Sequence, residues 1–132
     1  MIFSKTTLYA LKILHLMASE KKEVYSGQYL HDQLGIPLQY LRQLLTTLSK
    51  NGYIQSRRGR SGGFEFKKDP KEIFIADIID TVEGLEAFNT CFLNFEECPF
   101  NNPCVLHEIW QESREKIIGV LKTTSIENFT NS

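Results

Sequence analysis

The sequence predicts a mainly α-helical protein with one small β-hairpin. In several long stretches apolar residues recur every three or four positions, which is the period of an amphipathic helix. Residues 53–68, YIQSRRGRSGGFEFKK, differ, because two short segments that favour strands flank a loop of arginines and glycines. The length of 132 residues suits one compact domain, near the size at which a second copy adds stability.

The first predicted helix covers residues 5–19. Its apolar positions follow helical spacing, so we expect this helix to lie in the core of the domain. The residues expected on its inner face are Leu8, Leu11, Leu14 or His15, and Ala18, with Ile13 and Met17 widening that face.

Two further helices are predicted on either side of Gly35. Ser26 is a residue type that caps helix N-termini, and Gly35 can take the left-handed conformation that ends a helix. Pro37 suits the first turn of the next helix, which continues to Asn51-Gly52. Together they form a helix-turn-helix, whose second helix can enter the major groove of DNA. The buried stripe of that helix would be Leu41, Leu44, Leu45 and Leu48, although any helical hairpin would show such leucines.

The face of the second helix opposite these leucines is polar and contains no acid. A merely hydrated face usually includes Glu or Asp, so this pattern favours a surface that recognises DNA bases or phosphates. Arg42 in particular is suited to guanine or phosphate. The predicted DNA contacts on this helix are Gln39, Tyr40, Arg42, Gln43, Thr46 and Lys50.

A hairpin follows the helix-turn-helix directly and is predicted to be a wing. Tyr53-Ile54 and residues 64–66 form its strand segments. Arg57, Arg58 and Arg60 would project from its tip towards a phosphate backbone or a minor groove, where guanidinium groups are favoured. The alternative is an ordinary solvated turn. We favour DNA binding because the helix face and the loop are basic together.

The net charge of -1 conceals two halves of opposite sign. Residues 1–68 hold eleven Lys and Arg against four Asp and Glu, a balance of +7, and residues 69–132 hold four against twelve, a balance of -8. A basic half is expected of a surface that binds a polyanion, because each neutralised phosphate releases counterions. Ordinary solvated charge remains the alternative.

The C-terminal half predicts a short helix over residues 73–84 and a long helix over residues 105–124. So much apolar surface on the long helix of a short chain favours a homodimer, which would match a pseudo-palindromic operator in double-stranded DNA. The alternative is that this helix folds back on the first one. We therefore divide the chain into a winged helix-turn-helix region (1–84), a cysteine-containing loop (85–104) and a dimerisation helix with its tail (105–132), within one compact domain.

Several classes of protein are disfavoured by what the sequence lacks. The opening residues show neither a signal peptide nor a membrane span, so we expect a cytoplasmic protein without a membrane partner. No nucleophile-base pair, nucleotide-binding loop or CxxC motif is present, so we do not expect an enzyme.

All three cysteines and one histidine lie within residues 91–107, CFLNFEECPFNNPCVLH. In a reducing compartment clustered cysteines more often bind metal or perform redox chemistry than form structural disulfides. Thiolates are the usual ligands of iron-sulfur clusters, whereas three cysteines and a histidine also suit tetrahedral zinc. Free or oxidation-sensitive thiols are a further alternative.

The order of these parts resembles the Rrf2 family of bacterial transcriptional regulators. The wing matches the family's R-G-x-x-G-G-[YF] run at Arg58, Gly59, Gly62, Gly63 and Phe64, and residues 48–54 match the segment that precedes it. The resemblance covers nearly the whole chain. It implies a winged helix-turn-helix fold, DNA binding and regulation of transcription.

The three cysteines resemble those of the IscR-like and NsrR-like members of that family, which carry cysteines before the last helix and hold an iron-sulfur cluster. The resemblance implies operator affinity controlled by a cluster that senses iron-sulfur status, redox state or nitric oxide. A histidine ligand favours a 2Fe-2S cluster over a 4Fe-4S cluster, with zinc as the alternative. The alternative interpretation is a regulator without a cluster, controlled by zinc, thiol oxidation or a protein partner. The implied ligands are Cys91, Cys98, Cys104 and His107.

Overall fold

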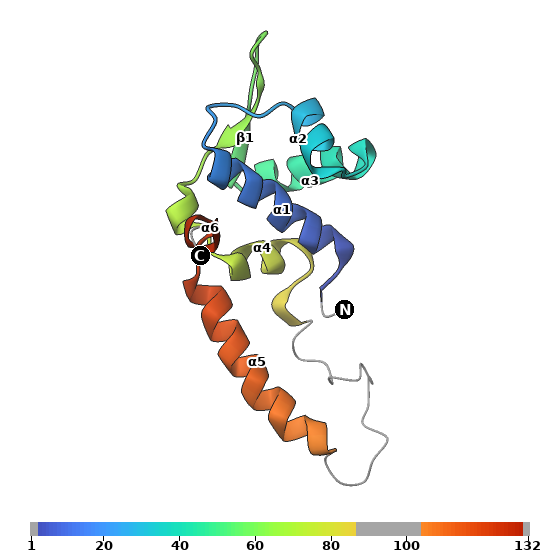
Figure 1. The fold of residues 1–132 in the computed structure, drawn as a ribbon, viewed down its shortest axis with the longest axis vertical. Helices are drawn as coiled ribbons and strands as arrows, with labels where there is room; N and C mark the ends of the chain where they lie inside the picture. Colours follow the sequence, from blue (N-terminus) through green and yellow to red (C-terminus); the bar gives the residue numbers. More distant parts are fainter. Residues whose placement is uncertain (1–2, 87–103, 131–132) are drawn as a thin grey trace.

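The computed structural model describes residues 3–86 and 104–130 and confirms the predicted fold class (Figure 1). Most of the chain is helical, with one antiparallel hairpin and a long helix near the C-terminus. The helices are α1 (Lys5–Glu20), α2 (Gly27–Leu34), α3 (Leu38–Lys50), α4 (Ile75–Val82), α5 (Val105–Thr123) and α6 (Ile126–Thr130). The strands are β1 (Ile54–Arg57) and β2 (Gly63–Phe66), and the 3-10 turn η1 (Pro70–Glu72) follows them.

The helix-turn-helix forms where its capping residues predict it. The Ser26 hydroxyl accepts a hydrogen bond from the backbone N–H of Tyr29 at 3.0 Å and so begins α2. Gly35 ends α2 with a φ of 67° and donates its N–H to the carbonyl of His31 at 2.9 Å. The four predicted leucines of α3 are buried, which leaves the opposite face of α3 outside the core.

Helix α1 is central to the core, but its inner face differs from the predicted one. Leu8 and Leu11 are only half-buried. Helices α2, α3, α4 and α6 all contact α1, and its buried residues form one stripe that is turned away from Leu8 and Leu11. Because apolar residues lie on most sides of this helix, their spacing could not identify the inner face. The residues buried on it are Thr7, Ala10, Ile13, Leu14, Met17 and Ala18.

The wing is tied to the body by a short backbone bridge. Tyr25, just before α2, donates its N–H to the Phe64 carbonyl at 2.8 Å and accepts from the Phe64 N–H at 2.7 Å. A Cβ on Gly63 would lie 2.3 Å from the Tyr25 carbonyl oxygen. Only glycine allows the two backbones to approach so closely. The strands are also longer than predicted, since β1 continues to Arg57, which pairs with Gly63.

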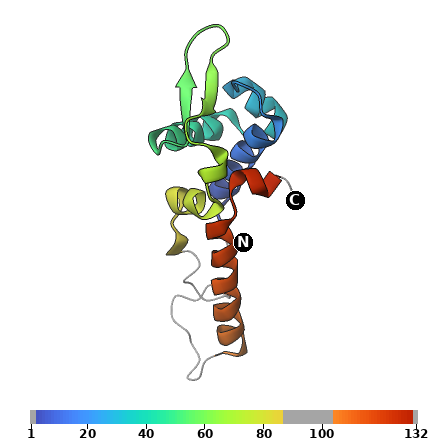
Figure 2. The same cartoon turned by 90° about the vertical axis from the view of Figure 1, so that its left-hand side faces the viewer.

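Helix α5 extends away from the head formed by the other helices and the wing (Figures 1 and 2). At its C-terminal end the backbone returns to the head, where the Ile75 N–H donates to the Thr124 carbonyl at 3.1 Å and the Ile126 N–H donates to the Ile73 carbonyl at 2.8 Å. Helix α6, which the sequence did not predict, then packs against α1. Within residues 3–86 and 104–130, no helix is both long and apolar enough to cross a lipid bilayer.

Candidate nucleic-acid interface and cysteine segment

The outer face of α3 forms an exposed polar surface. All six side chains predicted there to contact DNA, namely Gln39, Tyr40, Arg42, Gln43, Thr46 and Lys50, are exposed. Arg42, Gln43 and Thr46 line a surface hollow of about 470 Å³ together with Thr47. The Thr46 hydroxyl donates to the Arg42 carbonyl at 2.9 Å, so it presents an acceptor oxygen and a methyl group to an approaching molecule.

The turn before α3 is held by a side chain that the sequence did not single out. The Nδ1 atom of His31 lies 2.6 Å from the Ile36 carbonyl oxygen. Because a carbonyl only accepts, Nδ1 carries the proton in this contact. The bond spans the turn between α2 and α3, and His31 therefore helps to fix the angle at which α3 presents its outer face.

The three wing arginines do not lie together at the tip. Arg58 and Arg60 are in the turn between the strands and are exposed, whereas Arg57 is the last residue of β1. The Arg57 Nη1 atom lies 2.8 Å from a carboxylate oxygen of Glu23 and 3.8 Å from one of Glu65. The hydrogen bond to Glu23, followed by the charges of Glu23 and Glu65, raises the pKa of Arg57 above its ordinary value.

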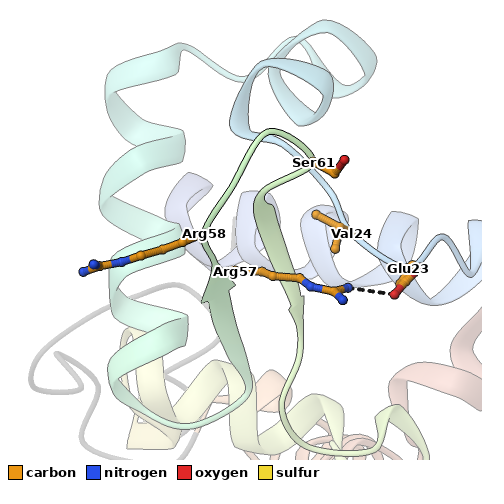
Figure 3. A pocket seen from close by; sticks show the side chains of 5 residues that line it. All are labelled: Glu23, Val24, Arg57, Arg58 and Ser61. Carbon is orange, nitrogen blue, oxygen red and sulfur yellow. Dashed lines mark hydrogen bonds and ion pairs between the residues drawn. The ribbon is translucent and has the colours of Figure 1, made fainter.

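Figure 3 shows the side chains of Arg57 and Arg58 leaving the hairpin in opposite directions. Arg57 points to Glu23, in the segment between α1 and α2, and a hollow of about 400 Å³ lies between this segment and the wing. The residues that line it are Glu23, Val24, Arg57, Arg58 and Ser61. The role of Glu23 could not be predicted from the sequence, because its partner Arg57 is 34 positions away.

Two of the four predicted cluster ligands lie together at the start of α5. Cys104 caps the helix, and its Sγ accepts a hydrogen bond from the Leu106 N–H at 3.4 Å. His107 is exposed in the first turn, three positions further along, where residues share a helix face. Thiolate and imidazole are ligand types of both iron-sulfur clusters and zinc, so this pair fits either group. Cys91 and Cys98 lie outside the described residues. Among the described residues no three Cys, His, Asp or Glu side chains form a metal site.

The sequence profile of the Rrf2 family, described as iron-dependent transcriptional regulators, matches residues 3–132. A protein of Aquifex aeolicus named as an HTH-type transcriptional regulator is 32% identical over 99% of this chain and 92% of its own length. The chain belongs to the Rrf2 family. It is therefore a DNA-binding transcriptional regulator, and its relatives are regulators rather than enzymes.

Other members of the Rrf2 family cover this chain to different extents. IscR of Photorhabdus laumondii is 35% identical over 76% of this chain, and the match spans only 61% of IscR. The structure of CymR, the global cysteine regulator of B. subtilis, superposes with a TM-score of 0.77 at 25% identity, covering 98% of this chain and 95% of CymR. The likeness to CymR thus extends over the whole fold, including the long C-terminal helix.

Proposed function

We propose that this Rrf2 regulator binds an iron-sulfur cluster through Cys91, Cys98, Cys104 and His107, and that the cluster controls its affinity for operator DNA. The pairing of Cys104 and His107 on one turn of α5 carries this proposal. The iron-dependent description of the family and the similarity to IscR support it. When bound, such a cluster supplies a group that can be lost, oxidised or nitrosylated. An imidazole ligand favours the 2Fe-2S form, since replacing thiolate by imidazole is known for that cluster type.

The DNA contacts in this proposal come from the outer face of α3 and from the wing. The exposed, acid-free surface of α3 suits the major groove, and Arg58 and Arg60 suit adjacent phosphates or the minor groove. Arg57 is not included, because its guanidinium is paired with Glu23. A regulator of transcription acts where the chromosome is, so we expect a cytoplasmic location and no membrane partner. The contacts on α3 are Gln39, Tyr40, Arg42, Gln43, Thr46 and Lys50.

The surface of α5 supports a homodimer. None of the residues of α5, all of which the structure describes, is buried. Because an α-helix turns by 100° per residue, its four exposed large apolar side chains share one face. A second copy of α5 would cover that face, and a two-fold dimer matches two operator half-sites. The exposed fractions are 82% for Val105, 59% for Ile109, 39% for Ile117 and 60% for Val120.

Anaerobic purification followed by visible absorption spectroscopy and analysis of iron, sulfide and zinc tests the cofactor. We expect a coloured protein with iron and sulfide in equal amounts. A colourless protein with one zinc per chain would contradict the iron-sulfur assignment and leave DNA binding intact.

The effect on DNA binding is tested at one salt concentration with a duplex selected by the wild-type protein from a randomised pool. We expect iron-loaded and iron-free protein to differ in affinity, and the Cys98→Ala variant to behave like iron-free protein. Equal affinity of the three proteins would rule out control by a cluster.

A second candidate function is regulation without a cluster, through thiol oxidation, a zinc site or a protein partner. The likeness to CymR, the global cysteine regulator of B. subtilis, favours this alternative. Here the purified protein would contain no iron, and its affinity for the selected duplex would respond to a thiol oxidant or to an added partner protein. Iron at stoichiometric amounts together with sulfide would rule it out.

A further inference from the structure

We propose that Arg57 is a positioning residue of the wing rather than a DNA contact, and that its ion pair with Glu23 sets the direction in which Arg58 and Arg60 approach DNA. The inference rests on the proposed contact of the wing with DNA and is independent of the cluster. In this proposal, Glu23 and Glu65 are the ion-pair partners that hold the Arg57 side chain in place.

The position of the pair supports this role. Arg57 is the last residue of β1 before the turn and pairs in register with Gly63. Glu23 lies two residues before Tyr25, which is bonded to Phe64 in β2. The segment from Glu23 to Tyr25 therefore contacts both strands of the hairpin, one through a side chain and the other through the backbone. The ion pair adds a side-chain contact near the turn to the two backbone hydrogen bonds between Tyr25 and Phe64, and so restricts the outer part of the hairpin further.

Arg57 is also poorly placed to bind phosphate. Its Nη1 already lies against carboxylates of Glu23 and Glu65, at 2.8 Å and 3.8 Å, so a phosphate would have to displace a negative charge to reach it. Its side chain leaves the hairpin away from Arg58 (Figure 3). Arg58 has no such carboxylate within ion-pair distance among the described residues, which leaves it as the better phosphate ligand of the two.

The direction in which Glu23→Gln changes DNA affinity distinguishes the two possible roles of Arg57. If Arg57 bound DNA and Glu23 competed for it, Glu23→Gln would release Arg57 and tighten binding. Loss of a negative charge near the DNA surface would act in the same direction. If the pair positions the wing, Glu23→Gln weakens binding despite that electrostatic gain. Since exposed ion pairs contribute little, we expect a loss of about two- to fivefold.

The test measures the affinity of the anaerobically purified full chain for the selected duplex by fluorescence anisotropy at several salt concentrations. We expect Arg57→Gln and Glu23→Gln both to weaken binding, Arg57→Gln somewhat more because it also removes a positive charge. The double variant should bind no more weakly than Arg57→Gln alone, because the ion pair is already lost, and the slope of log K against log salt should stay at the wild-type value in all three. Arg58→Gln should lower the slope of that dependence by about 0.9, the value for one lost phosphate contact. Glu72→Gln, which removes the same charge from η1, should not weaken binding.

Three results would overturn the inference. The first is tighter binding by Glu23→Gln. The second is a slope lowered by about 0.9 in Arg57→Gln but unchanged in Glu23→Gln, because Arg57 would then contact a phosphate. The third is an unchanged slope in Arg58→Gln together with a lowered slope in Arg42→Gln, because DNA would then bind α3 without the wing. Far-ultraviolet circular dichroism of each variant is the control for correct folding.

Discussion

Replacing Ile109 by Gln should disrupt the proposed dimer. Ile109 is 59% exposed, and full burial of an isoleucine side chain stabilises by about 1.5–3 kcal/mol. Burial of the exposed part by a partner therefore contributes about 1–2 kcal/mol per copy. A two-fold axis places the substitution in both copies, so the dimer loses about 2–4 kcal/mol and its dissociation constant rises by about 30- to 1000-fold. Glutamine retains the helix propensity of α5.

Sedimentation equilibrium over a range of protein concentrations measures this dissociation constant directly. Glu115→Gln is the matched control, because Glu115 is exposed on the same helix but lies about 120° away from Ile109 around its axis. We expect the control to dimerise like the wild type. If Ile109→Gln also dimerised like the wild type while circular dichroism showed intact helices, the apolar face of α5 would not be the dimer interface.

Three further substitutions test the N-cap of α2, the close approach of the wing to Tyr25 and the proposed role of His107 as a cluster ligand. Ser26→Ala removes the hydrogen bond to the Tyr29 N–H and should lower the free energy of unfolding in urea by about 1 kcal/mol. Gly63→Ala places a methyl group against the Tyr25 carbonyl and should weaken DNA binding as well as stability, both measured against wild type. His107→Ala should reduce bound iron or shift the visible spectrum without loss of helix content, and an unchanged spectrum would remove His107 from the ligand set.

Local signals in the sequence were sufficient for the helix-turn-helix. Ser26 and Gly35 act through bonds to residues three or four positions away, so the identities of nearby residues determine where α2 begins and ends. The buried leucines of α3 follow the same short-range rule. The polar face of α3 was predictable as a consequence, because a helix with one buried stripe has to expose the other side.

Features that depend on distant contacts were not predictable in this way. The inner face of α1 is chosen by the several helices that pack around it, which the spacing of its own apolar residues does not reveal. Helix α6 is short and begins at Ile126, which is fully buried and donates its N–H to the Ile73 carbonyl, and the helix packs against α1. Five residues are too few for helical periodicity to be seen.

The wing arginines illustrate the same limit at the level of function. The run RRGR predicts a basic tip by composition, and Arg58 and Arg60 lie in the exposed turn. The sequence could not show that the strand continues to Arg57 or that Glu23 meets it there. The end of β1 thus separates two adjacent arginines that composition treats as equivalent, since Arg57 is in the strand and Arg58 is in the turn.

Control of DNA binding by a group at Cys104 has to act through the arrangement of α5 rather than through charge. At 1.5 Å per residue, the 19 residues of α5 place Cys104 about 28 Å from the end of the helix at which the chain joins the head, and the wing lies on the far side of the head (Figure 1). This distance is several times the Debye length of about 8 Å at physiological salt, so a change of charge at Cys104 is screened before it reaches DNA. We therefore expect iron-loaded and iron-free protein to differ in operator affinity but to share the same slope of log K against log salt. A slope that changes with iron content would contradict this mechanism, because it would mean that the number of neutralised phosphates differs between the two forms.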